Sequence, residues 1–117
     1  MIAILSPCPL SLLDEARELL TLGYFTAAAT VARSALEAWA FAECDRIGYV
    51  PMSRRAWKLP GRIDGLFKLG VIDATQRHHA YVALEVGCAA AHGRPIDRAR
   101  VRCAVANLRS VVEGGGV

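Results

Sequence analysis

The stretch from Thr26 to Ile47 constrains the fold of this chain more than any other part of its sequence. It continues for about six helical turns, at roughly 3.6 residues per turn, without a proline or a glycine. Alanine, valine and leucine are so frequent in its first half that almost every face of the helix is apolar. Because a helix that is apolar all round is a buried helix, we expect it to be the axis of a bundle, with the other helices leaving room for Trp39 and Phe41.

Two charged residues, Arg33 and Glu37, interrupt the apolar part of this helix. They are four residues apart, so they stand one above the other on the same face. The sequence leaves two interpretations open. The two side chains are either an internal ion pair that the fold tolerates, or part of a functional site.

The length and composition of the chain indicate one domain that associates with itself. A chain of 117 residues can bury a single core without disulfides or a structural metal, so we expect one domain over residues 1–117. Hydrophobic residues make up 54% of the chain, and the mean hydropathy is +0.30. This is more apolar surface than one small core hides, and a subunit interface accounts for the excess. We therefore expect a homo-oligomer, with a homodimer as the specific prediction.

The sequence shows no segment that would place the chain in a membrane. The longest run without a charge, Leu19–Ala32, is shorter than the roughly 20 apolar residues of a membrane span, and it contains Gly23. The start of the chain lacks the basic residues of a secretory signal and reaches Pro7 and Pro9 early. We expect a cytoplasmic protein with no membrane contact.

The four cysteines are spread along the chain without a C-x-x-C pair, and three of them fall in helical patterns. This spacing predicts reduced thiols in the core rather than disulfides or a zinc site. The sequence also lacks a glycine-rich phosphate loop and a metal-binding signature, so no metal and no cofactor are predicted.

The remaining patterns are helical, and none alternates with the period of a strand. Ser11 with Asp14, and Asp73 with Gln76, resemble capping boxes that start helices. The predicted fold is all-α, an antiparallel bundle of four long helices plus one or two short ones, between an arm over residues 1–10 and a flexible tail over 114–117. The expected helices run approximately over Ser11–Leu22, Thr26–Ile47, Arg62–Leu69, Ala74–Ala91 and Asp97–Glu113.

A basic group lies in the one long connection, which joins Tyr49 to Gly61. Here Arg54, Arg55 and Lys58 are close to Trp57, and an aromatic ring beside cations can stack on a base or hold a phosphate. The alternative is that the indole packs under the connection while the charges face water.

A second basic group, formed by Arg98, Arg102 and Arg109, follows one face of the last predicted helix. With Arg100, it brings several cations close to the start of that helix, where the helix dipole favours anions. This arrangement indicates either an acidic partner, such as RNA or a nucleotide, or a solvated face.

Histidines are the remaining candidates for chemistry. His78 and His79 are adjacent, so they point to different faces of a helix and cannot chelate one metal together. His92 follows a helix end built from small residues. It is either a residue that caps this end or a catalytic group.

Three segments in order resemble the HEPN-type helical domains, in particular their uncharacterised bacterial branch. They are the Ala-rich helix with AR-x-x-LE, the element LPGRIDGLFKLGVID, and the helix end VGCAAAHG, and the resemblance covers roughly residues 11–113. It implies a helical bundle that usually dimerises and that occurs in bacterial toxin, defence and mobile-element proteins.

Active HEPN proteins are metal-independent ribonucleases, in which an Arg and a His separated by four to six residues meet across a dimer cleft. In this chain the His corresponds to His92, and Gly87, Val86 and Glu85 stand where the Arg would be. Cys88 replaces an Asn that often precedes the His.

The resemblance therefore favours a non-catalytic, dimeric interaction or regulatory module. One alternative is a ribonuclease or nucleotide-modifying enzyme that uses His92, with Arg33 beside Glu37, or Arg94, supplying the missing cation. The other is RNA or nucleotide binding without catalysis, through the two basic groups.

Overall fold

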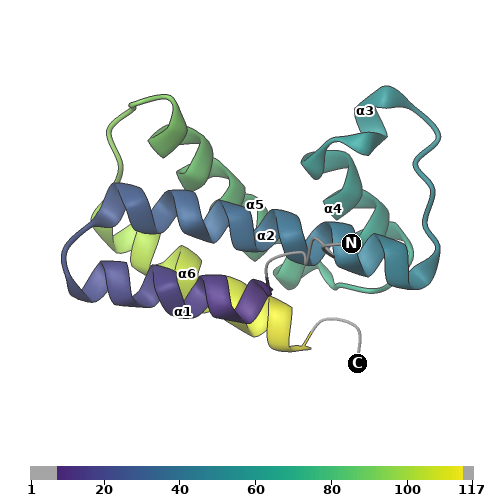
Figure 1. Ribbon diagram of the computed structural model, residues 1–117. Coiled ribbons are helices and arrows are strands. Elements are labelled where there is room, and N and C mark those ends of the chain that lie inside the picture. Colours follow the sequence, from purple (N-terminus) through teal and green to yellow (C-terminus); the bar gives the residue numbers. More distant parts are fainter. Residues whose placement is uncertain (1–7, 115–117) are drawn as a thin grey trace, which may run out of the picture.

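Helix α2 (Phe25–Ile47) is the axis of the fold, as the sequence predicts. The computed structural model describes residues 8–114. In this part of the chain α2 packs against α1 (Pro9–Thr21), α4 (Leu59–Lys68), α5 (Ala74–Ala91) and α6 (Arg98–Gly114), and the short α3 (Arg54–Trp57) packs on α4 (Figure 1). Residues 8–114 contain no strand. The all-α class and the count of four long and two shorter helices are confirmed.

The prediction that α2 is buried on all sides is wrong. One face of the helix is in the core and includes Ala32, Leu36 and Trp39. On another face Thr30 and Phe41 are exposed to solvent. That face of α2 is therefore not part of the core.

Helix α1 begins earlier than its sequence pattern predicts. Its first residue is Pro9 and its N-cap is Cys8, whereas Ser11 lies inside the helix and makes no cap. Proline suits the first helical position because its φ is already helical and its missing N–H would have no partner there. Residues 9 and 10 of the predicted arm are therefore helical, and residues 1–7 of that arm lie outside the described chain.

Glycines end the first two helices, which form an antiparallel hairpin (Figure 1). Gly23 has a φ of 84° and Gly48 a φ of 70°, and both values belong to the left-handed region that glycine adopts without strain. These two helix ends are confirmed.

The long connection contains α3, and the predicted helix Arg62–Leu69 starts three residues earlier, at Leu59. The Ser53 Oγ caps α3 by accepting a hydrogen bond from the Ala56 N–H at 3.2 Å. Pro60 lies in the first turn of α4, where its missing N–H has no cost.

The last two helices agree with their predicted bounds. Asp73 and Gln76 form the predicted capping box of α5, in which each side chain accepts from the backbone N–H of the other at 2.8 Å. The Asp97 Oδ1 accepts from the Ala99 N–H at the start of α6 at 3.0 Å. Gly114 closes α6, and residues 115–117 of the predicted tail lie outside the described chain. None of the helices in residues 8–114 has the length and apolar character needed to cross a membrane.

Helices α2 and α5 approach each other closely at Gly87. A Cβ atom added at Gly87 of α5 would overlap the Arg33 Cβ on α2 and would lie 2.9 Å from the Arg33 Cδ. The Arg33 Cβ is tied to the α2 backbone and cannot turn away. The absence of a side chain at Gly87 therefore sets the distance between the two central helices.

We predict that Gly87→Ala lowers the free energy of unfolding by about 1–3 kcal/mol, because α2 and α5 must move apart to accept one methyl group. Alanine is a better helix former than glycine by roughly 0.5–1 kcal/mol, so any net loss of stability in this variant must come from the packing of α2 against α5. Urea unfolding followed by circular dichroism measures it. Gly114→Ala is the matched control, since a Cβ there meets only the Gln76 Nε2 at 3.8 Å. Equal stability of the two variants would contradict the prediction.

Candidate functional site

His92 lies at the C-terminal end of α5 and is exposed. It is the C-cap residue, and its backbone N–H donates to the Cys88 carbonyl oxygen at 3.0 Å. Gly93 follows with a φ of 67° and ends the helix. Within residues 8–114 the imidazole makes no hydrogen bond or ion pair. The backbone of His92 thus has the helix-end position, while its side chain is open to solvent.

Arg33 and Glu37 do not form an ion pair with each other. The aliphatic part of Arg33 packs on Gly87, and its Nε is buried without a hydrogen-bond partner in the described chain. The Glu37 carboxylate is exposed and borders a separate hollow that contains Phe41 and Asp45. The interpretation as an internal pair is wrong, because the Arg33 side chain follows the gap that Gly87 leaves.

Glu85 is one of the α5 residues that the predicted HEPN resemblance places where the nuclease arginine would be. Its Oε2 accepts a hydrogen bond from the Arg100 Nη2 of α6, and the two side chains form an exposed ion pair. Arg100 therefore neutralises a carboxylate on this part of α5. Arg94, the other proposed substitute, is exposed beyond the helix end, where its backbone N–H donates to the Ala89 carbonyl oxygen at 2.9 Å.

The three arginines of the second basic group, Arg98, Arg102 and Arg109, do not form one uniform basic surface on α6. The Arg98 and Arg102 guanidinium carbons each lie 5.0 Å from the centroid of the Phe25 ring, so that both cations contact one aromatic ring. Arg109 instead bridges two carboxylates, since its Nη1 lies 2.7 Å from Asp14 on α1 and its Nε 2.9 Å from Glu113. These two ion pairs neutralise Arg109, which weakens the prediction that Arg109 binds a phosphate.

The residues of the basic group around α3 also lie in different surroundings. Arg54 and Arg55 are both exposed, but only Arg55 borders the hollow beside this helix. Trp57 is 52% exposed, so its indole is neither packed under the connection nor free on all sides. One of its faces is covered by Arg62, with the guanidinium carbon 4.9 Å from the ring centroid.

Arg62 is a buried cation that the sequence patterns did not single out. Only 4% of it is exposed, and its guanidinium carbon lies 3.8 Å from the centroid of the Phe41 ring on α2. Its Nε donates to the Trp57 carbonyl oxygen at 3.0 Å. No carboxylate pairs with it in residues 8–114. Arg62 of α4 therefore joins α3 to α2 through two aromatic rings and one backbone oxygen. This also corrects the prediction for Phe41, which is 37% exposed and covered by a cation rather than by other helices.

Cys44 lies next to this contact and is fully buried. Burial raises the pKa of its thiol, and a hydrogen bond with Arg62 opposes this rise. The four cysteines are free thiols, as predicted, but only Cys44 belongs to the core, whereas Cys8 and Cys103 are exposed. In the described chain no three His, Cys, Asp or Glu side chains converge as metal ligands.

A hollow of about 530 Å³ lies between α3, α4 and α5. Two glycines of α4, Gly61 and Gly65, line this hollow and allow neighbouring residues to lie close to the helix backbone. A Cβ at Gly61 would lie 2.5 Å from the Ala56 Cα, and one at Gly65 would lie 2.7 Å from the ring of Tyr49. The hollow exists because both glycines let α3 and Tyr49 approach the α4 backbone. Its lining consists of Tyr49, Ser53, Arg55, Ala56, Lys58, Pro60, Gly61, Asp64, Gly65, Lys68 and Tyr81.

Asp64 is the only carboxylate that lines this hollow, and it is already paired. Its Oδ1 accepts from the Tyr81 hydroxyl at 2.9 Å and from the Arg77 Nε at 3.0 Å. Partial burial raises the pKa of Tyr81, and the hydrogen bond to Asp64 adds to this rise. The phenol therefore stays protonated as a donor at neutral pH. Arg55, Lys58 and Lys68 form no ion pair within residues 8–114, so the hollow has a net positive charge.

The sequence patterns identified Arg55 and Lys58 of this hollow but missed Lys68 and the two tyrosines. Gly61 and Gly65, four residues apart on one face of α4, were the signal that could have indicated a close approach at this point. Tyr49 and Tyr81 are far apart in the chain, so no local pattern connects them.

Comparison with known proteins gives no family assignment. No family model, no curated protein and no solved structure matches the chain at a significant level.

We predict that Arg62→Leu lowers the free energy of unfolding by about 2–3 kcal/mol, because the variant loses two cation–aromatic contacts and leaves the Trp57 carbonyl oxygen without its donor. Chemical unfolding followed by circular dichroism measures the change. Arg46→Leu is the matched control, since Arg46 is an exposed partner of Glu43 on α2 and such pairs contribute about 0–1 kcal/mol. A loss no larger than that of the control would show that Arg62 does not join α3 to α2.

Proposed function

We propose that this chain is a HEPN-like helical bundle that acts as a dimeric interaction or regulatory module, without the ribonuclease activity of the active HEPN proteins. The observation that carries the proposal is the ion pair between Glu85 and Arg100. A nuclease of this type needs a cation near the His to stabilise negative charge on the phosphate. Here the corresponding part of α5 presents the Glu85 carboxylate, and Arg100 is engaged by it.

The arrangement of α2 and α5 supports the HEPN-like assignment. The helix that contains the AR-x-x-LE segment packs directly on the helix that ends in VGCAAAHG, with Arg33 against Gly87. The order of four long and two shorter helices also agrees with the resemblance. These features support the proposed scaffold, while the usual pair of catalytic side chains is incomplete in the sequence.

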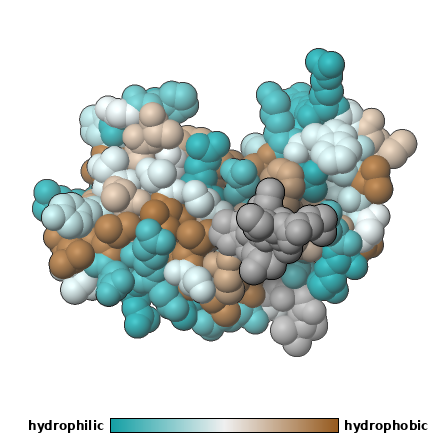
Figure 2. All heavy atoms as spheres, in the orientation of Figure 1, coloured by the Kyte–Doolittle hydropathy of each residue, from teal (hydrophilic) through white to brown (hydrophobic). Residues whose placement is uncertain are grey.

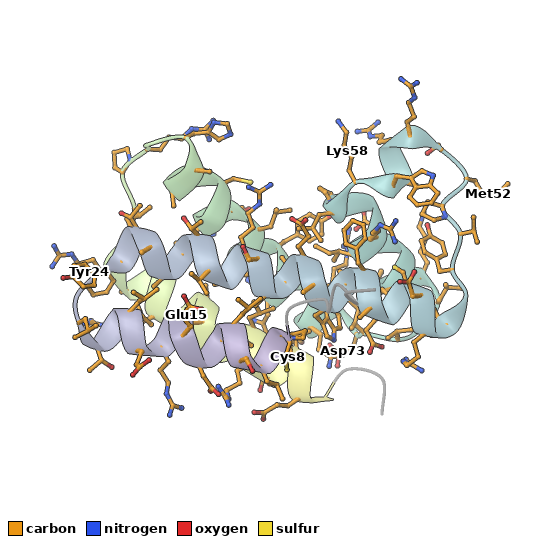
Figure 3. The ribbon with its side chains drawn as sticks, viewed as in Figure 1. Cys8, Glu15, Tyr24, Met52, Lys58 and Asp73 are labelled. Atoms are coloured by element: carbon orange, nitrogen blue, oxygen red, sulfur yellow. The ribbon has the colours of Figure 1, made fainter. Side chains whose placement is uncertain are left out.

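Exposed apolar side chains around α3 support the proposal of a homodimer. Val50 is 66% exposed, Met52 94% and Trp57 52%. Met52 lies on the outer edge of the connection before α3 and points away from the bundle (Figure 3). In the space-filling view this edge shows hydrophobic residues next to the hydrophilic side chains of α3 (Figure 2). A second copy of the chain would remove this apolar edge from water.

For the non-catalytic part of the proposal, we expect that the purified chain leaves single-stranded RNA intact in the presence of a chelator, at the same level as its His92→Ala variant. Gel analysis of end-labelled RNA measures cleavage. His78→Ala is the control, because His78 is also exposed on α5 but far from its C-terminal end. Cleavage that disappears in His92→Ala and persists in His78→Ala would refute the proposal and support the enzyme alternative.

For the dimer, we expect the unchanged chain to have twice the mass of one chain in size-exclusion chromatography with light scattering, and Met52→Glu to shift it toward the monomer. A carboxylate without a partner inside an apolar interface costs several kcal/mol, which amounts to a hundredfold or more in affinity, roughly. Leu22→Glu is the matched control at the turn between α1 and α2, where Leu22 is 67% exposed. A monomeric unchanged chain, or equal effects of both substitutions, would contradict the prediction.

A further inference from the structure

We propose that the hollow between α3, α4 and α5 is a binding site for a nucleoside diphosphate. The hollow does not include His92, so its assignment does not depend on the absence of nuclease activity.

The size of the hollow suits one nucleotide. Its volume is about 530 Å³, and pockets for small ligands typically measure ~300–1,000 Å³. A phosphate ion alone would leave most of this space unfilled. Because Gly61 and Gly65 hold the walls against the α4 backbone, the hollow is part of the packed fold and does not need a loop to close over it.

The charges around the hollow favour a ligand with several negative charges. Arg55, Lys58 and Lys68 contribute three cations from three places: α3, the junction of α3 with α4, and the last turn of α4. Lys58 extends outward from that junction, beside the hollow (Figure 3). The carboxylate of Asp64 does not offset them, because Arg77 already pairs with it at 3.0 Å. Three cations without protein partners match the charge of a diphosphate group.

Two tyrosines, Tyr49 and Tyr81, also line the hollow and add aromatic surface, which a purely anionic ligand would not contact. The Tyr49 ring lies against Gly65, which holds it in one orientation. The Tyr81 hydroxyl is held by Asp64 at 2.9 Å and by the Pro60 carbonyl oxygen at 3.3 Å. Fixed aromatic rings beside cations can bind the base of a nucleotide while the cations bind its phosphates.

Isothermal titration calorimetry with three probes tests this proposal: ADP, adenosine and pyrophosphate. We expect one ADP to bind per chain, with affinity at least tenfold higher than that of adenosine or pyrophosphate, because only ADP engages both the rings and the cations. The double variant Lys58→Ala, Lys68→Ala should lower ADP affinity by at least tenfold, since a charge-assisted hydrogen bond contributes about 1.5–3 kcal/mol. Arg17→Ala on α1 is the matched control for loss of an exposed cation and should bind ADP as the unchanged chain does.

A second measurement needs no variant, because Lys58 and Lys68 are the only lysines of the chain. We expect ADP to slow acetylation of both lysines, measured by mass spectrometry, while adenosine leaves both rates unchanged. Absence of ADP binding at millimolar concentration would overturn the proposal. Equal affinity for ADP and pyrophosphate would also overturn it, since it would show an anion site without a nucleotide, and unchanged binding in the double variant would place the nucleotide elsewhere.

Discussion

The close contact between α2 and α5 at Gly87 is the constraint on which the rest of the fold depends. With no side chain at this position, the Arg33 stem rests on the α5 backbone and the two central helices share one core. Helices α1 and α6 then pack against this pair from the other side. The same contact also fixes how far the C-terminal end of α5, with His92, lies from α2. One glycine therefore influences both the packing of α2 on α5 and the position of His92.

A second contact, around Arg62, attaches the smaller part of the molecule. Helix α3 packs on α4 but not directly on α2, so its position depends on the guanidinium that lies between Phe41 and Trp57. This buried cation has aromatic rings and a backbone oxygen as partners in place of a carboxylate. Such an arrangement satisfies the charge without adding an acidic group next to the hollow, which keeps that hollow positively charged.

The cations of the chain fall into two classes with different roles. Arg100 and Arg109 are neutralised by carboxylates, and Arg98 and Arg102 lie over the ring of Phe25. These contacts connect α6 to α5, α1 and α2. Around α3 and α4, by contrast, two lysines and Arg55 have no partner among residues 8–114. These three cations contribute much of the net charge of +3, and they lie beside the hollow between α3, α4 and α5.

The sequence by itself determined the all-α class, the central helix, the capping box of α5 and the ends of the first two helices, because each is a local pattern of period, cap or backbone freedom. The start of α1 was misplaced because Ser11 and Pro9 offered competing local signals. Only the tertiary structure decided that Arg33 rests on Gly87 instead of pairing with Glu37, that Arg62 is buried between two rings, and that Tyr49 and Tyr81 share one hollow. Each of these contacts joins residues on different helices, so it depends on how the helices pack and not on any pattern along the chain.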